Sequence, residues 1–242
     1  MTGEEFKRGV IQPVQCYKEA WEMIKGQYWM VFATVLVGIL VGSIIPFLII
    51  GPMICGIYLC LFDAYEGKPV DLGKLFKGFD YFLSSLLVTL IIVVPVIFMM
   101  VLLYIPMLMI MFTGGRIADE EMLLYIGGML FVEFIFIIAM VCLHTLVIFS
   151  YQLLVDRKTS AWRSITLSAR AVWANLGGIA GLMGVGMIVV FLGYLALCIG
   201  IYLAIPLIFA ANLVAYRKVF PALPGAGFHA PPPPNVYQGF QG

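Results

Sequence analysis

The stretch "WMVFATVLVGILVGSIIPFLIIGPMICGIYLCLF" covers residues 29–62 and contains no charged side chain. About 20 helical residues cross a bilayer core about 30 Å thick, so this block is too long for one span. Pro46 and the pair Gly51-Pro52 interrupt it near its middle. Because proline and glycine break or kink helices, the stretch predicts a tight hairpin of two short membrane spans.

Three further apolar blocks follow this hairpin, at residues 81–113, 123–155 and 176–216. The last block has Gly193 and Gly200 near its middle and predicts a second hairpin. Each of the other two blocks predicts one helix about 50 Å long, tilted or protruding from the bilayer. We expect Pro95 and Pro106 to kink the first of these two helices. The sum is six spans.

The composition supports the same conclusion. Of the 242 residues, 63% are hydrophobic and 11% are charged, whereas soluble domains average about 45–50% apolar and about 25% charged residues. The sequence therefore predicts an all-α, polytopic transmembrane helical bundle whose six spans form three hairpins. A net charge of +1 argues against a nucleic-acid partner, which requires a basic surface.

The basic residues fix the expected orientation. Only Arg116, in "GGRIADEEM" between spans three and four, lies on one side of a six-span chain. The other thirteen of the fourteen basic residues lie on the opposite side: Lys7, Arg8, Lys18, Lys25, Lys68, Lys74, Lys77, Arg157, Lys158, Arg163, Arg170, Arg217 and Lys218. The positive-inside rule makes that side cytoplasmic, with both termini inside.

An amphipathic segment precedes each hairpin, at residues 14–28, 71–80 and 160–176. Each predicts a helix in the cytoplasmic headgroup plane, with aromatic residues at the boundary and basic residues toward anionic lipid. Asp71 is the expected N-cap of the second segment. Membrane lipids are thus the expected partners, and the interfacial contacts are Trp21, Lys74, Lys77, Trp162, Arg163, Arg170 and Trp173.

The C-terminal residues 221–242, "PALPGAGFHAPPPPNVYQGFQG", differ sharply in composition from the transmembrane domain at 1–220. Proline and glycine cannot continue a helix, and "PPPP" favours an extended polyproline II segment. We expect a disordered cytoplasmic tail. The alternative is a docking motif for a proline-recognising partner.

Two ionisable residues inside span four are candidates for an intramembrane polar site. Glu133 and His144 are eleven residues apart, so they share a helix face, and Thr145 follows His144. Counted back from Asp156, His144 lies about 18 Å deep and Glu133 about 34 Å deep. This depth predicts that a neighbouring helix satisfies His144 and that Glu133 is at the outer interface. A proton or cation path is the alternative.

Other candidate sites are weaker. Polar residues at the ends of spans two and six suggest a cytoplasmic vestibule of Asp63, Tyr65, Asn212 and Tyr216. Small residues that let helices approach closely predict packing faces at Gly38, Gly42, Gly177 and Gly181. A methionine stripe at Met100, Met107 and Met111 could bind Cu(I), but no Cys-His cluster accompanies it. No catalytic motif is present, so we expect no enzyme activity, metal or cofactor.

The motif Gly-Pro-x-x-x-Gly-x-Tyr at 51–58, followed by Gly67 and "LFKGF" at 75–79, resembles a family. "DRKTSAWRSITLSARAVWANLGG" at 156–178 extends the likeness. The chain resembles uncharacterised bacterial polytopic inner-membrane proteins related to the membrane domain of some glycerophosphoryl diester phosphodiesterases. The resemblance implies a bacterial cytoplasmic membrane. Its catalytic domain has no counterpart here, so that activity is not implied.

Two functions remain from the sequence. The first is a non-catalytic scaffold, complex subunit or lipid-organising protein, working as a homo-oligomer or with a membrane partner. The second is a channel or carrier with a path beside His144. Carriers of polar solutes place several ionisable groups at mid-membrane, and this chain has few. That scarcity favours the scaffold, or a carrier of an apolar, lipid-like solute.

Overall fold

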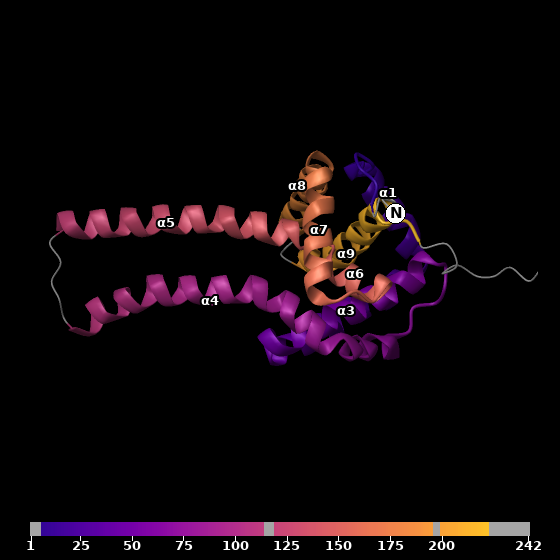
Figure 1. The fold of residues 1–242 in the computed structure, drawn as a ribbon, viewed down its shortest axis with the longest axis horizontal. Helices are drawn as coiled ribbons and strands as arrows, with labels where there is room; N and C mark the ends of the chain where they lie inside the picture. The colour runs from indigo at the N-terminus through magenta and orange to yellow at the C-terminus, as the bar shows by residue number, and fades with distance from the viewer. Residues whose placement is uncertain (1–5, 114–118, 196–198, 223–242) are drawn as a thin grey trace, which may run out of the picture.

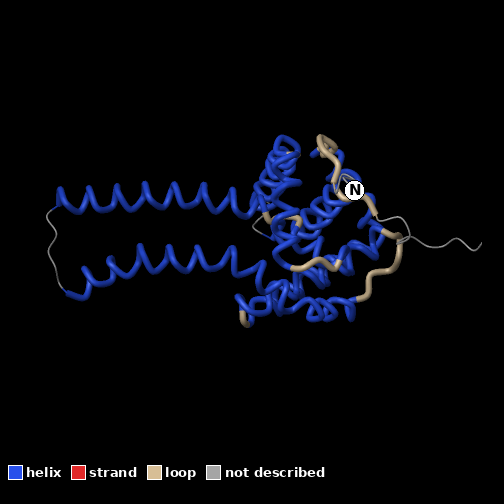
Figure 2. The backbone as a smooth tube through the Cα atoms, viewed as in Figure 1, coloured by secondary structure: helices blue, strands red, loops and turns tan. Residues whose placement is uncertain are grey.

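The computed structural model describes residues 6–113, 119–195 and 199–222, where every regular element is a helix (Figure 1, Figure 2). Six segments of this part are long and apolar enough to cross a membrane. The predicted all-α, multi-pass architecture is therefore confirmed. The elements are α1 (Pro13–Ile24), η1 (Lys25–Gln27), α2 (Tyr28–Ile44), α3 (Pro46–Tyr65), η2 (Leu72–Tyr81), α4 (Phe82–Thr113), α5 (Asp119–Leu146), α6 (Ser150–Arg157), α7 (Ala161–Ala174), α8 (Leu176–Leu195) and α9 (Ile199–Val219).

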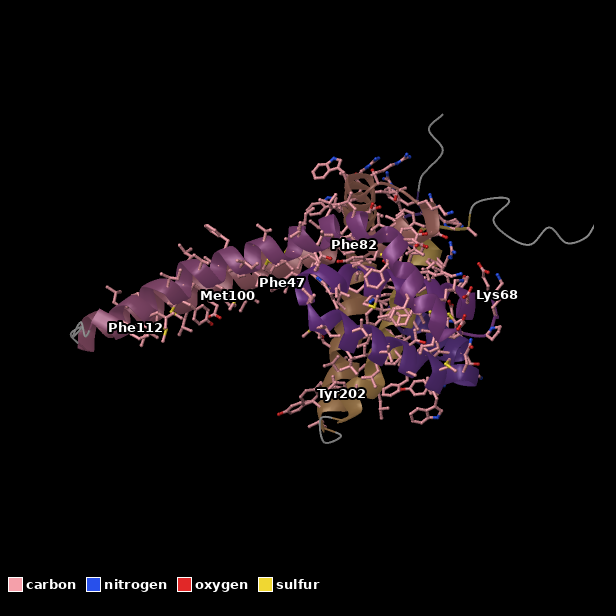
Figure 3. The ribbon with its side chains drawn as sticks, turned by 90° about the horizontal axis from the view of Figure 1, so that it is seen from below. Phe47, Lys68, Phe82, Met100, Phe112 and Tyr202 are labelled. Carbon is pink, nitrogen blue, oxygen red and sulfur yellow. The ribbon has the colours of Figure 1, made fainter. Side chains whose placement is uncertain are left out.

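Two parts make up the molecule. α4 and α5 run side by side and project from the other helices; we call this pair the arm and the remaining helices the head (Figure 1). Figure 3 shows Phe82 of α4 in the head, Met100 midway along the arm and Phe112 near its far end. Most apolar side chains on the projecting part are exposed, so this surface requires lipid or protein around it.

The α2–α3 hairpin forms as predicted, with its turn at Ile45. Gly38 and Gly42 lie where the two helices meet. A Cβ atom on Gly38 would stand 2.9 Å from the Ile57 side chain, and one on Gly42 would stand 2.7 Å from that of Ile50. Because glycine has no side chain, the two helices can pack closely at these positions.

The segment after this hairpin is helical and begins at the predicted cap. The Asp71 carboxylate accepts a hydrogen bond from the Gly73 N–H at 2.9 Å. The structure differs from the prediction of a helix in the headgroup plane: η2 is a 3₁₀ helix that packs antiparallel along α3. Leu75 is fully buried, whereas Lys77 is exposed.

The turn between α3 and η2 lies at Glu66–Pro69, as its composition predicts. Gly67 has φ +72°, a left-handed conformation that favours glycine. The Gln27 side chain holds the turn by donating to the Lys68 carbonyl (3.2 Å) and accepting from the Val70 N–H (2.9 Å). Lys68 also donates to Glu66, which raises the pKa of Lys68.

The fourth apolar block departs from its prediction. Residues 123–155 do not form one helix, because α5 ends at Leu146 and α6 begins at Ser150. The depths predicted for His144 and Glu133 assumed one unbroken helix from Asp156, whereas the structure has two helices, α5 and α6. The third block does form the single predicted helix, α4, which continues through Pro95.

Of the two glycines predicted to form a packing face on α8, Gly181 packs against a neighbour and Gly177 does not. A Cβ atom on Gly177 would meet nothing within 4 Å, so this glycine is not a packing position. Gly178 instead lies against Ile11, and Gly181 against Pro13, with Cβ distances of 2.7 and 2.6 Å. One residue turns a helix by about 100°. The N-terminal segment, whose position the sequence did not reveal, selects this face of α8.

Gly78 provides a test of the η2–α3 contact. A Cβ atom on Gly78 would stand 2.0 Å from the Pro52 carbonyl oxygen, which is backbone and cannot rotate away. We expect Gly78→Ala to lower the free energy of unfolding by about 2–3 kcal/mol in detergent. Gly177→Ala is the control, because it adds a methyl group to open space and should stabilise α8 slightly. Equal stabilities would contradict this packing.

Candidate functional site

The break between α5 and α6 is held by one side chain of α7. The Phe149 N–H donates to the Ser168 hydroxyl oxygen at 3.1 Å, and that hydroxyl donates to the Leu146 carbonyl at 2.7 Å. Both backbone groups would otherwise be unpaired in a buried position, which costs about 1–3 kcal/mol each. Ser168 thus fixes α7 at the base of the arm.

The orientation of α7 follows from its small residues. Its buried face consists of Ala161, Ser164, Leu167, Ser168, Ala171 and Val172. Trp162 and Trp173, which the sequence placed in lipid contact, are 72% and 74% exposed. Small side chains permit close packing on the head, so the two indoles project outward, as interfacial tryptophans do.

The other predicted lipid-contact residues are mostly at the surface. Trp21, Lys77, Arg163 and Arg170 are exposed. Lys74 differs, because its ammonium group donates to both carboxylate oxygens of Asp63 at 2.6 Å.

A groove of about 590 Å³ lies where α7 meets the arm. α7 contributes Ala161, Trp162 and Ile165, α5 contributes Leu143, and α4 contributes Leu87, Leu90, Ile91, Val94 and Pro95. The volume is within the range of ligand pockets, roughly 300–1,000 Å³. With a wholly apolar set of lining side chains, the groove can hold a hydrocarbon chain but cannot position a polar reaction.

Polar side chains at the junction of α3, α4 and α6 satisfy one another. The hydroxyl groups of Thr89 and Tyr151 are 3.0 Å apart, and Thr89 also donates to the Ser85 carbonyl at 2.9 Å. With its amide oxygen toward Tyr58, Gln152 accepts from the Tyr58 hydroxyl at 3.0 Å. These buried hydrogen bonds stabilise the contacts between the three helices.

The structure does not bring the predicted intramembrane residues together into one site. The His144 side chain is exposed near the end of α5 and makes no hydrogen bond with the described residues. Thr145 is the residue that contacts a neighbouring helix, donating to Met183 Sδ of α8 at 3.2 Å. Glu133 is half-buried midway along α5, not at its outer end. The expected roles of His144 and Glu133 are thus both revised by the break at 147–149.

The predicted vestibule residues do not form one open polar site. Tyr216 is fully buried and donates to Asp156 at 2.7 Å, and Arg217 pairs with the same carboxylate at 2.8 Å. The guanidinium of Arg217 lies 4.5 Å from the centre of the Phe62 ring. Asp63 instead pairs with Lys74, and Asn212 is half-buried. The contacts of this cluster hold α3, α6 and α9 together.

Sequence reasoning missed Ser168, Asp156 and Arg217. The charges of Asp156 and Arg217 were interpreted only as residues at helix ends. Ser168 was one polar residue in an amphipathic helix, with no signal for its partner nineteen residues earlier. Among the residues that the structure describes, no group of three or more His, Cys, Asp or Glu side chains could hold a metal ion.

Comparison of the chain with protein-family models, curated proteins and solved structures gives no match. The resemblance stated from the sequence motifs therefore stays a prediction, and function is argued from the site itself.

Ser168→Ala tests whether the Ser168 hydroxyl stabilises the contact between α7 and the break beside the groove. Loss of the hydroxyl leaves the Phe149 N–H without its acceptor, so we expect the free energy of unfolding to fall by about 1–3 kcal/mol. Thr166→Ala is the control on the same helix, since Thr166 bonds only to carbonyls of its own helix. Denaturant unfolding in detergent measures both. A loss no larger than that of Thr166→Ala would contradict the bridging role.

Proposed function

We propose that this protein is a non-catalytic, lipid-organising scaffold of the bacterial cytoplasmic membrane, and that its groove holds a lipid acyl chain. The observation that carries this proposal is the apolar groove between α4, α5 and α7. Its walls on α4 and α5 belong to candidate membrane spans. Acyl chains are the apolar groups that surround such helices at molar abundance, so an open apolar groove in a membrane span is filled from the bilayer itself.

The position of α7 supports a lipid over another apolar ligand. Trp162 is both a lining residue of the groove and a largely exposed side chain. Tryptophan prefers the headgroup level of a bilayer, and the neighbouring Arg163 and Arg170 are exposed on the same helix. An acyl chain lying along α4 would therefore leave its headgroup beside a basic, aromatic helix.

The distribution of charge supports the orientation in this proposal. Basic residues lie before and within α7 and in the last turn of α9, and thirteen of fourteen lie on one side of a six-span chain. With that side cytoplasmic, both termini face the cytoplasm, and the loop that contains Arg116 faces the opposite compartment. Residues 223–242, expected to be a cytoplasmic tail, lie outside the described residues.

Leu90→Trp tests occupancy of the groove. Leu90 lines the groove and is partly exposed, so the indole fills the space without enlarging the core. A phosphatidylethanolamine with a diazirine in its acyl chain is photolysed in vesicles that contain the protein. We expect cross-links in Leu87–Pro95 and in residues 161–165, reduced about tenfold by Leu90→Trp because the indole occupies the space of the chain.

Leu102→Trp is the matched control. Leu102 lies farther along α4, is 50% exposed and is not a lining residue, so the same change should leave the cross-links unaltered. Equal labelling of wild-type protein, Leu90→Trp and Leu102→Trp would overturn the groove as a lipid site.

The alternative is a carrier of an apolar solute along a path beside His144. The specific observation in its favour is that His144 is exposed next to Leu143, which lines the groove. The scaffold predicts that His144→Ala leaves lipid labelling unchanged and that wild-type protein produces no flux of a labelled phospholipid between the leaflets above that of empty vesicles. A wild-type flux that His144→Ala abolishes would replace the scaffold with the carrier.

A further inference from the structure

A second groove, of about 480 Å³, lies between α1, the end of α3 and α9. We call it the α1 groove. It shares no lining residue with the groove beside the arm. Figure 3 places Lys68, which follows the lining residue Gly67, at the end of the head away from the arm. The volume of the α1 groove is within the range of ligand pockets, so it can admit a short peptide segment.

The α1 groove has an apolar floor and a polar rim. On the floor, Ala64 and Val214 are buried and Met23 is half-buried. The floor suits apolar side chains or rings, whereas the rim can form hydrogen bonds with the backbone of an extended peptide. The exposed side chains of the rim are Gln15, Lys18, Glu22 and Tyr65.

Both carboxylates that line the α1 groove have a basic partner. The Lys218 ammonium group donates to Glu19 at 2.9 Å, and that of Lys25 donates to Glu22. Since these pairs neutralise the negative charge of the groove, it offers little attraction to a metal ion or a basic peptide. The groove therefore favours an uncharged ligand.

Two groups on the rim are hydrogen-bond donors without an acceptor. The Lys18 ammonium group and the Tyr65 hydroxyl group make no hydrogen bond within the described part of the chain. The Tyr65 side chain is 47% exposed, and its ring centre lies 5.9 Å from the Arg217 guanidinium group. An aromatic ring beside donors suits a polyproline II segment, whose carbonyl oxygens have no partner in their own helix.

We propose that the α1 groove binds residues 231–234, "PPPP", of this chain's own tail. These prolines have no backbone N–H groups and present only carbonyl oxygens, the acceptors that Lys18 and Tyr65 require. The proline rings pack against the Tyr65 ring and the apolar floor. Residues 221–242 contain no Asp, Glu, Lys or Arg, so docking brings no unpaired charge into the groove.

The tail begins close to the α1 groove. Val214 of the floor precedes Pro221 by seven residues along the end of α9, or about 10 Å. Pro231 follows Pro221 by ten residues, a reach of up to about 31 Å in polyproline II form. Gly225 and Gly227 lie between them and allow the chain to turn back. The segment therefore meets the groove at the high effective concentration of a tethered ligand.

The tail fits the groove better than other occupants do. A lipid acyl chain would leave both donors of the rim without an acceptor. A proline-rich segment of another protein would have the right chemistry but not the advantage of the tether. A partner that recognises the proline segment must consequently displace it from the groove first.

Disulfide cross-linking in full-length protein tests the contact. The background Cys142→Ser and Cys198→Ser leaves only native cysteines that are buried. In this background, Asn235→Cys places a thiol directly after the proline segment, and Glu22→Cys places one on the rim of the groove. We expect copper-phenanthroline to link the two thiols within one chain, as measured by mass spectrometry of proteolytic peptides.

Lys158→Cys paired with Asn235→Cys is the matched control. Lys158 is exposed and follows Arg157, which donates to the Pro221 carbonyl oxygen at 3.3 Å. The thiol at residue 158 is therefore equally close to the start of the tail but outside the groove, and we expect it to link about tenfold more slowly. Equal rates for the two pairs, or links formed only between two chains, would overturn the proposal.

The chemistry of the contact is tested in the linked pair. Replacement of residues 231–234 by serine should slow linking about tenfold, and so should Tyr65→Ala, whereas Tyr65→Phe keeps the ring and should slow it about threefold. The serine variant leaves every residue of the head unchanged, so its result does not depend on how well Tyr65→Ala folds. Linking of the serine variant at the wild-type rate would show that the proline segment does not bind the groove.

This inference goes beyond the lipid-organising scaffold and is independent of it. Neither Tyr65 nor Glu22 lines the groove beside the arm, so lipid labelling should persist in all of these variants. Loss of tail linking with intact lipid labelling, or the reverse, therefore identifies which of the two proposals has failed.

Discussion

Backbone N–H and C=O groups inside hydrocarbon must find partners within the protein, because lipid tails form no hydrogen bonds. Helices meet this requirement through their own backbone, which explains why the described chain is helical nearly throughout. The interruption at residues 147–149 would violate it. It persists because the Ser168 hydroxyl accepts from Phe149 and donates to Leu146, replacing the helical bonds with a contact between α7 and the break. The direction of α6, the position of α7 and the groove beneath it all depend on this pair of bonds.

The break also organises the part of the head around the end of α9. α6 turns away from α5 and brings Asp156 to the end of α9, where the carboxylate binds both Tyr216 and Arg217. Phe149, at the break itself, is fully buried against Tyr216 and Phe220. A buried ion pair adds little stability by itself but strongly disfavours arrangements that leave one charge unpaired. The cluster that resembled a polar vestibule in sequence therefore specifies how three helices meet.

The helices of the head pack closely against one another, whereas those of the arm make few contacts. In the head, glycines bring backbones together: Gly56 and Gly78 allow α3 and η2 to touch, and Gly178 and Gly181 admit the N-terminal segment. Dispersion contacts of this kind replace the hydrophobic effect, which is weak between helices already in lipid. The arm has few such contacts and exposes large apolar side chains along its length.

From the sequence alone it could be predicted that this is a helical membrane protein, that α2 and α3 form a hairpin and that Asp71 caps a helix. These features depend on local quantities: apolar length, proline and glycine positions, and short-range hydrogen bonding. Tertiary structure alone decided the break after Leu146, the packing of Gly178 in place of Gly177, and the surroundings of Glu133 and His144. Each of these depends on a residue distant in the chain, such as Ser168 or Ile11, and a span of uniform apolar residues carries no signal for which partner will reach it. Hydropathy specifies that a segment is in the membrane, whereas specific contacts specify where it bends and which face it buries.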